Sequence, residues 1–364
     1  MARPCTPSLA AALLCLVIIS GERFLPQCAG CPRDDRRALL DIQSFLSEHL
    51  PLNYWDSSIR DCCQWRDVTC DSRTGRVTGL DLDAFPYPPA SPLNTSLFLP
   101  LEELQSLSLK NVGINGCMPG AELSTMKLET LDLSDNAING TISTDVQYLH
   151  LSENQFNGTF PLSLGTDIYT IDLQGNQFSG ILPRLMFKAF PKLQIMLLER
   201  NMFEGMIPND ICHLKCLRLL DLSHNKLSGK LPSCLSNIGS DDESFNFQYS
   251  DRNITSIFLM FPVSSYQDLL AQYTKFISQP DQEEFMTKSR KDYYKGNMLN
   301  YMSGLDFSSN QLKGSIPESI GDMKWLRALN FSANYFDGSI PQSLSNLSDR
   351  ISLTTTWRAK YLQS

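Results

Sequence analysis

The stretch Leu217-Arg-Leu-Leu-Asp-Leu-Ser-His-Asn-Lys-Leu-Ser-Gly-Lys-Leu-Pro232 decides the fold of this chain. Blocks of the same form recur along the sequence, each with apolar residues at fixed places and an asparagine followed four residues later by a glycine. Seven copies carry the asparagine, at Asn136, Asn154, Asn176, Asn201, Asn225, Asn310 and Asn334, and Val112 marks a degenerate eighth. The usual step is 24 residues, with a step of 18 after Asn136 and one of 85 after Asn225. Such a period predicts a solenoid of stacked coils, one coil per block.

The block is that of a leucine-rich repeat. We therefore predict an α/β fold, a curved leucine-rich-repeat solenoid with a parallel sheet on its concave face, a helical amino-terminal cap and an inserted island. Paired leucines should point into the core, and each asparagine should turn inward to bond backbone groups of neighbouring coils. The coil of Asn225 should stack on that of Asn310. About nine parallel strands are expected to begin near residues 79, 106, 130, 148, 170, 195, 219, 304 and 328.

Each block ends in Gly-x-apolar-Pro, as at Gly229 to Pro232, and a cap-like run reads Cys62-Cys-Gln-Trp-Arg-Asp-Val-Thr-Cys70. These features resemble the plant-specific leucine-rich-repeat proteins, namely receptor-like kinases, receptor-like proteins and polygalacturonase-inhibiting proteins. The resemblance covers residues 31 to about 347. It implies the disulfides Cys31–Cys62 and Cys63–Cys70, which sequence alone cannot connect.

The other cysteines are judged by their place in the repeat. Cys212 and Cys234 lie 22 residues apart, close to one period, so they should reach each other on adjacent coils. Cys117 and Cys216 are about four coils apart, roughly 20 Å at the usual strand spacing, and should stay free thiols.

The expected organisation follows from these motifs. Residues 1–30 read as a signal peptide, because an apolar run from Leu9 to Ile19 follows Arg3. The remaining ranges are a cap at 31–75, repeats at 76–238, an island at 239–299, repeats at 300–347 and an irregular tail at 348–364. Six N-x-[ST] sequons predict glycosylation, at Asn94, Asn139, Asn157, Asn253, Asn330 and Asn346. The location is expected to be secreted or extracellular, or the plasma membrane if a longer form carries an anchor.

The island and the end of the chain refine the resemblance. The return from the island, through Lys295, looks like that of plant receptor-like proteins, whereas polygalacturonase inhibitors lack an island. After Leu347 the repeat stops, so the chain resembles a truncated ectodomain. In the family, later repeats meet co-receptor kinases, and a membrane anchor follows them.

A net charge of −8 argues against nucleic acid as a partner. The scattered histidines lack a nucleophile constellation, so no enzyme activity, metal or cofactor is expected. The resemblance instead implies an extracellular ligand-recognition module of a plant receptor-like protein, which binds a peptide, protein or small ligand in defence or development, with receptor kinases as co-receptors. The alternatives are a secreted polygalacturonase-inhibitor-like protein and a truncated non-signalling product. Candidate ligand contacts form an outward stripe with the island lysine: Tyr148, His150, Tyr169, Asp172, Arg200, Arg218 and Lys295.

Overall fold

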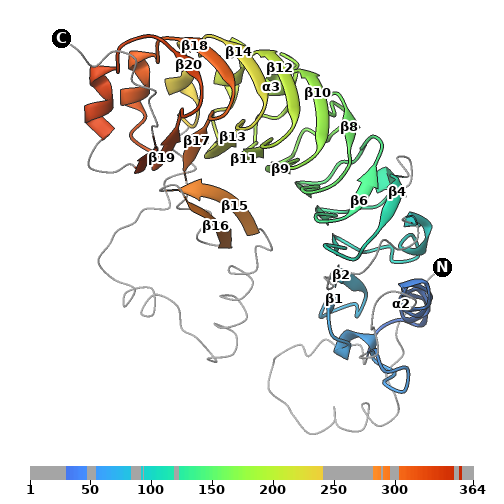
Figure 1. Cartoon of the computed structure of the whole chain (residues 1–364). Helices are drawn as coiled ribbons and strands as arrows, with labels where there is room; N and C mark the ends of the chain where they lie inside the picture. Colours follow the sequence, from blue (N-terminus) through green and yellow to red (C-terminus); the bar gives the residue numbers. More distant parts are fainter. Residues whose placement is uncertain are drawn as a thin grey trace, which may run out of the picture. The chain divides into compact units, whose positions relative to one another are not determined.

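The computed structural model of this 364-residue chain describes residues 30–46, 55–82, 92, 94–118, 123–240, 282–287, 290–295, 303–347 and 352–354. The chain divides into two compact units, residues 1–146 and 147–364, which are treated separately below. In each unit, short strands of successive coils lie side by side, and turns and short helical segments connect them (Figure 1). This arrangement is the predicted leucine-rich-repeat solenoid.

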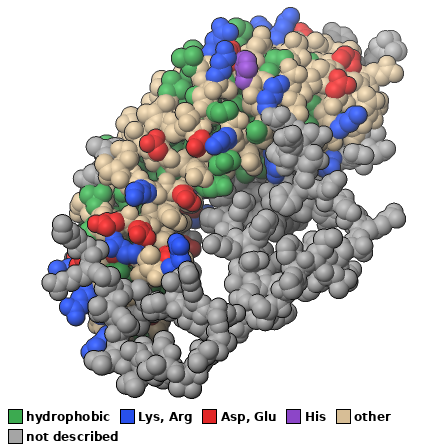
Figure 2. Space-filling model, turned by 180° about the vertical axis from the view of Figure 1, so that it is seen from behind, with side chains coloured by type: hydrophobic (Ala, Val, Ile, Leu, Met, Phe, Trp, Pro, Cys, Tyr) green, Lys and Arg blue, Asp and Glu red, His purple; other side chains and the backbone are tan. Residues whose placement is uncertain are grey.

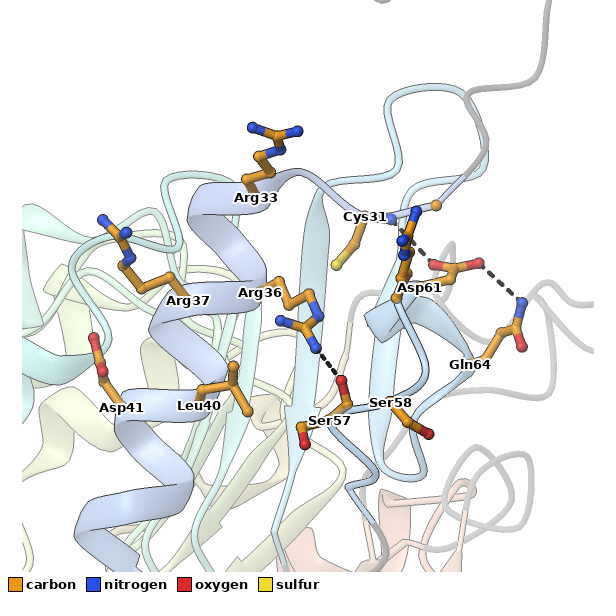
Figure 3. A pocket seen from close by; sticks show the side chains of 12 residues that line it. Cys31, Arg33, Arg36, Arg37, Leu40, Asp41, Ser57, Ser58, Asp61 and Gln64 are labelled. Atoms are coloured by element: carbon orange, nitrogen blue, oxygen red, sulfur yellow. Dashed lines mark hydrogen bonds between the residues drawn. The ribbon is translucent and has the colours of Figure 1, made fainter. Parts of the chain in front are cut away.

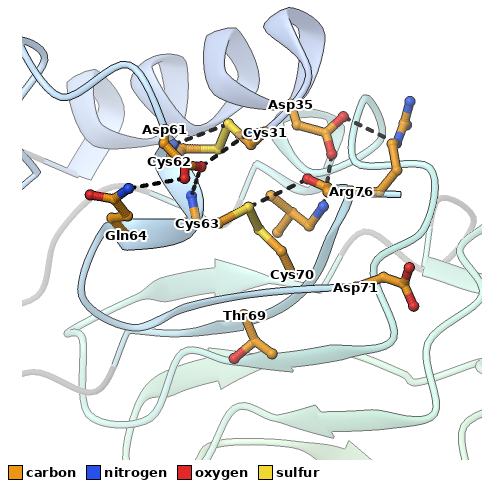
Figure 4. Close-up of a disulfide and its surroundings, with 12 residues drawn as sticks. Cys31, Asp35, Asp61, Cys62, Cys63, Gln64, Thr69, Cys70, Asp71 and Arg76 are labelled. Atoms are coloured by element: carbon orange, nitrogen blue, oxygen red, sulfur yellow. Dashed lines mark hydrogen bonds and ion pairs between the residues drawn. A yellow bond between two sulfur atoms is a disulfide. The ribbon is translucent and has the colours of Figure 1, made fainter. Parts of the chain in front are cut away.

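The amino-terminal cap is built around one amphipathic helix. Helix α2 (Arg33–Leu46) carries two aspartates in its first turn, where negative charge favours a helix. A 3-10 turn η1 (Cys62–Gln64) and strand β1 (Val68–Cys70) follow, and β1 pairs antiparallel with β2 (Val77–Asp81). Disulfides join Cys31 to Cys62 and Cys63 to Cys70, the pairs implied by the resemblance (Figure 4).

A buried carboxylate fastens the cap to the first repeat. Asp35 on α2 is fully buried, accepts a hydrogen bond from the Val77 N–H at 2.8 Å, and pairs with Arg76 at 3.3 Å. Burial raises the pKa of Asp35, and the Val77 bond and the Arg76 charge oppose that rise. Because β2 also pairs with β1, from Val77 opposite Cys70, it begins at residue 77, two residues before the predicted start.

The remainder of the first unit contains two parallel ladders. One runs from β2 through β3 (Ser106–Ser108) to β5 (Thr130–Asp132). The other pairs β4 (Asn115–Cys117) with β6 (Ala137–Asn139). Two 3-10 turns, η2 (Thr95–Leu97) and η3 (Leu123–Thr125), complete these coils.

The second unit has a main parallel sheet with one short strand per coil. Its strands, in order, are β7 (Tyr148–His150), β9 (Thr170–Asp172), β11 (Ile195–Leu197), β13 (Leu219–Asp221), β17 (Gly304–Asp306), β19 (Ala328–Asn330) and β21 (Ser352–Thr354). From β7 to β19 the strands begin at the predicted residues. Because Leu220 is the register partner of Leu305, the coils on either side of the 85-residue step stack directly, as predicted.

Further elements complete the second unit. A second parallel sheet consists of β8 (Asn157–Gly158), β10 (Gln177–Ile181), β12 (Met202–Met206), β14 (Lys226–Gly229), β18 (Gln311–Gly314) and β20 (Tyr335–Phe336). Helical segments follow several coils: α3 (Met186–Ala189), η4 (Asn209–His213), η5 (Leu235–Asn237), η8 (Glu318–Asp322) and η9 (Gln342–Leu347). A hairpin pairs β15 (Gln282–Thr287) with β16 (Arg290–Lys295).

Asparagines and phenylalanines line the core of the second unit. Asn176 is buried, and its Nδ2 donates to the Leu151 carbonyl of the preceding coil at 2.8 Å. The rings of Phe156, Phe178 and Phe203 stack in sequence, each 6.3 Å from the next. The asparagine of each coil therefore satisfies backbone groups of the preceding coil, which is the role predicted for it. The phenylalanines repeat because each ring packs on the ring of the preceding coil.

One strand lies where the sequence suggested irregular structure. We assigned residues 348–364 to an irregular tail, but Ser352–Thr354 forms β21 parallel to β19. The unpaired N–H and C=O groups of an edge strand attract any extended segment, so a full repeat motif is not needed there. Several expectations lie outside the described residues: the signal peptide up to residue 29, the sequon at Asn253, most of the island, and residues 355–364.

Candidate functional site

The candidate ligand contacts lie on the outward face of the main sheet in the second unit. In each three-residue strand the middle side chain points into the core, as Leu220 does, and the flanking two lie on the opposite face. Tyr148, His150 and Asp172 occupy such flanking positions. The other three lie beside strands: Tyr169 precedes β9, Arg200 follows β11, and Arg218 precedes β13.

Two tyrosines from successive coils form the aromatic part of this face. The rings of Tyr148 and Tyr169 stack with their centroids 5.8 Å apart and their planes 20° apart. This separation is typical of an offset aromatic pair. Both side chains are half-buried, so they present a rigid surface that is still accessible.

Three of the predicted contacts are buried instead of solvent-exposed. His150 and Asp172 are each 5% exposed and are register partners on β7 and β9, and Arg218 is 8% exposed. Burial raises the pKa of Asp172, and the positive charge of His150 opposes that rise. Burial lowers the pKa of the Arg218 guanidinium. The stripe lies on the outward side, as the repeat predicts, but at these three positions it is not exposed, because strand periodicity shows which face a side chain takes and not what covers it.

Arg200 is an exposed cationic group beside this face. Its guanidinium forms an ion pair with Glu153, two coils earlier, and its Nε lies 3.8 Å from Glu199. Gly175 lies on the coil between Arg200 and Glu153 and leaves room for their ion pair. A Cβ added at Gly175 would lie 2.5 Å from a Glu153 carboxylate oxygen. Gly175 also has φ of +61°, which favours glycine. The side chains of Arg200 and Glu153 are 47% and 46% exposed.

A buried acidic pair lies on the same face and was missed by the sequence analysis. Asp221 and Asp306 are register partners on β13 and β17, and each is 2% exposed. Burial, followed by the charges of Asp306 and Glu199, raises the pKa of Asp221 well above its usual value. The pKa of Asp306 is also raised by burial. The recurring Leu-Asp-Leu triplet was the available signal, since it places aspartate at the same strand position in several coils.

The acidic pair also has structural partners. Asp221 accepts a hydrogen bond from the Ser223 N–H at 2.8 Å, and Asp306 accepts one from the Ser308 N–H at 2.8 Å. Asn330, on the next strand, donates from its Nδ2 to Asp306 at 2.8 Å. Burial and neighbouring like charges disfavour the ionised carboxylates, which is why the pKa of each aspartate is raised.

The sequons differ in accessibility. Asn94, Asn157 and Asn346 are exposed and Asn139 is half-buried. Asn330 is 6% exposed, and its Nδ2, the atom that would carry a glycan, is bonded to Asp306. This burial argues against a glycan at Asn330, contrary to the sequence expectation, because a sequon carries no information about burial.

The remaining candidates concern cysteines, metals and the island. Cys212 and Cys234 form a disulfide on adjacent coils, and among the described residues Cys117 and Cys216 take part in no disulfide. Across the part of the chain that the structure describes, no group of three His, Cys, Asp or Glu residues could hold a metal ion. No helix within that part is long and apolar enough to cross a membrane. Lys295 ends β16, and its side chain lies outside the described set.

Protein-family models match several stretches of the chain. The leucine-rich-repeat N-terminal domain matches residues 32–71, which contain the cap. Leucine-rich-repeat models match residues 166–227 and also 127–149, 145–166, 302–323 and 325–347. These matches cover the coils on both sides of the insertion.

The curated relatives are plant proteins. The chain is 35% identical over 241 residues to "Receptor like protein 21" of Arabidopsis thaliana, which covers 60% of this chain and 22% of that protein. It is 36% identical over 267 residues to "Putative receptor-like protein 8" of the same plant, covering 61% and 24%. The chain thus spans about a quarter or less of the length of these relatives.

Solved structures with the same fold include receptor ectodomains. The ectodomain of the Arabidopsis receptor kinase HAESA, in complex with an extended IDA peptide hormone, matches with TM-score 0.60 and 25% identity, over 87% of this chain and 43% of that one. HAESA with IDA and the co-receptor SERK1 matches with TM-score 0.57 and 21% identity, over 88% and 48%. A plant ice-binding protein matches with TM-score 0.54 and 22% identity, over 86% and 90%. The last two likenesses show the fold alone.

Proposed function

We propose that this chain, which belongs to the plant leucine-rich-repeat receptor-like proteins, is an extracellular recognition module for a peptide or protein ligand. The observation that carries the proposal is the accessible part of the outward sheet face, where the stacked pair Tyr148–Tyr169 and the oriented Arg200 occur together on one set of coils. Tyrosine and arginine are enriched among the residues that dominate binding energies.

The chemistry of this face suits an extended ligand. Two stacked rings offer a rigid apolar surface with polar edges, and Arg200 offers a guanidinium that Glu153 holds in place. Holding these groups in position lowers the entropy cost of binding. His150 and Asp172 are buried, so a ligand can contact them only by replacing the groups that bury them.

The cellular setting is part of the same proposal. An extracellular location is supported by the apolar run from Leu9 to Ile19, by the exposed sequons and by three disulfides, which persist in oxidising compartments. A receptor kinase is proposed as co-receptor partner, since the HAESA ectodomain, similar in fold, is known in complex with both a peptide hormone and SERK1.

A binding screen with matched variants tests the proposal. The secreted chain is titrated against fluorescent synthetic peptides drawn from plant extracellular fluid, with polarisation as the readout. For a peptide that binds, Tyr169→Ala and Arg200→Gln should each weaken affinity about tenfold, the usual effect of truncating a dominant contact. Lys226→Ala, an exposed change away from the tyrosine pair, should alter affinity less than about twofold. Absence of binding by every peptide, or equal effects of all three changes, would contradict the proposal.

Inhibition of a pathogen polygalacturonase is the alternative function. It is tested by adding the chain to a polygalacturonase assay. Inhibition that is retained in Tyr169→Ala and Arg200→Gln would favour this alternative over peptide recognition by the sheet face.

A further inference from the structure

A groove in the amino-terminal cap is lined by four arginines (Figure 3). Arg33, Arg36 and Arg37 lie on α2, and Arg60 lies on the segment that leads to the first 3-10 turn. Residues spaced i, i+3 and i+4 share one side of a helix. The sequence spacing therefore brings three guanidiniums to the side of α2 that borders the groove.

Arg36 is fixed by the protein itself. Its Nη2 donates to the Ser57 carbonyl at 2.6 Å, and its guanidinium lies 5.5 Å from the centre of the Trp65 ring. Its Nε is buried and has no hydrogen-bond acceptor. Arg36 therefore supplies a positive charge whose position is set before any ligand arrives.

The side chains of the other three arginines are exposed and have no described partner. The side chains of Arg33, Arg37 and Arg60 form no hydrogen bond or ion pair with any residue that the structure describes. A guanidinium is more weakly hydrated than an ammonium group, and its planar fork matches a carboxylate with two hydrogen bonds.

The acidic side chains of the groove do not cancel this charge. The lining holds four guanidiniums and two carboxylates, and one of these, Asp61, accepts hydrogen bonds from the Cys31 and Cys63 N–H groups at 3.0 and 3.1 Å and from Gln64 at 3.1 Å. Among the lining residues, Asp41 is the other carboxylate. The groove thus keeps a local excess of positive charge in a chain whose net charge is −8. Figure 2 shows one face of the molecule, on which basic and acidic side chains are interspersed.

The small free energy of one exposed arginine–anion pair limits which ligands the groove can bind. A single exposed arginine–anion pair contributes about 1 kcal/mol or less. Binding therefore requires a ligand that carries several anionic groups along an extended chain. Exposed Ser57 and Gln64 border the groove and offer hydroxyl and amide groups that suit sugar hydroxyls. We propose that the cap groove binds an acidic polysaccharide, whose uronate carboxylates pair with Arg33, Arg37 and Arg60.

The cap groove lies in the first unit, so polysaccharide binding there does not depend on peptide recognition by the second unit. It rests on the proposed function only for the extracellular location of the chain. The test uses the secreted chain and polygalacturonate as the probe, with binding measured at two salt concentrations. The triple change Arg33→Gln, Arg37→Gln and Arg60→Gln should weaken binding about tenfold and reduce its salt dependence.

A matched control removes the same charge elsewhere. The exposed lysines Lys226, Lys230 and Lys313 of the second unit, all changed to glutamine, should leave polygalacturonate binding within about twofold of the parent chain. Equal losses in the two triple variants would show a general charge effect and overturn the site. Circular dichroism and thermal midpoints establish that each variant folds.

Further probes decide the chemistry of the ligand. Neutral dextran should not bind. If dextran sulfate or inorganic phosphate binds as tightly as polygalacturonate, the groove is a general anion site and the polysaccharide assignment is wrong. Failure of the parent chain to bind polygalacturonate at low salt also overturns it. If the triple variant does not fold, Arg60→Glu, an exposed change without described partners, provides the same comparison.

Discussion

Removal of the Asn225 side chain is the most direct test of the asparagine ladder. The Asn225→Ala variant loses four hydrogen bonds that the Asn225 side chain makes in the second unit. Nδ2 donates to three main-chain carbonyls, those of Leu198, Leu222 and Ser223, at 2.9, 3.2 and 2.9 Å. Oδ1 accepts the Phe203 N–H at 2.9 Å.

These four bonds are not equivalent. Each of the three carbonyls keeps a second donor, supplied by Asn201, Asn310 and the Arg200 N–H. The buried Phe203 N–H, in contrast, loses the acceptor that Asn225 supplied. An unsatisfied buried donor costs about 1–3 kcal/mol, and each weakened carbonyl adds a few tenths to about 1 kcal/mol. Together the four terms give an expected loss in the free energy of unfolding of about 2–6 kcal/mol.

Equilibrium urea unfolding, followed by circular dichroism, measures this loss. The neighbouring exposed change Lys226→Ala is the control and should alter the free energy of unfolding by less than about 0.5 kcal/mol. Coincident midpoints for the two variants would refute the argument that the asparagines satisfy buried backbone groups between coils.

Two further predictions concern the outward face. Gly175→Ala should separate Glu153 from Arg200 and strain the left-handed backbone, so the free energy of unfolding should fall by about 1 kcal/mol or more in thermal unfolding. The control Glu153→Gln should lose only the exposed ion pair, and the free energy of unfolding should fall by less than about 1 kcal/mol. The raised pKa of Asp221 contributes stability that is fully present below its unfolded pKa and is lost as pH rises through its folded pKa. Chemical unfolding should therefore show lower stability at pH 7.5 than at pH 5, and Asp221→Asn should flatten this trend; an unchanged pH profile in the variant would contradict the raised pKa of Asp221.

The asparagine spacing determined most of the fold. An inward asparagine bonds backbone groups of the preceding coil, so regular steps between asparagines indicate which strands stack. The same argument predicted that the coils on either side of the 85-residue step stack on each other. Asn310 indeed donates a hydrogen bond to the Leu222 carbonyl at 2.8 Å. The pairing of Cys212 with Cys234 likewise follows from a separation close to one period.

The periodicity also identified which side chains face outward, but it could not determine their environment. That Asp221 and Asp306 are buried together, or that Glu153 reaches Arg200 across Gly175, depends on contacts between coils that lie tens of residues apart. Burial, charge pairing and pKa shifts arise from the sum of all neighbours in space, whereas the repeat motif constrains only the inward positions. The sequence by itself therefore determined the stacking of the coils, and only the tertiary structure decided which outward groups remain accessible to a ligand.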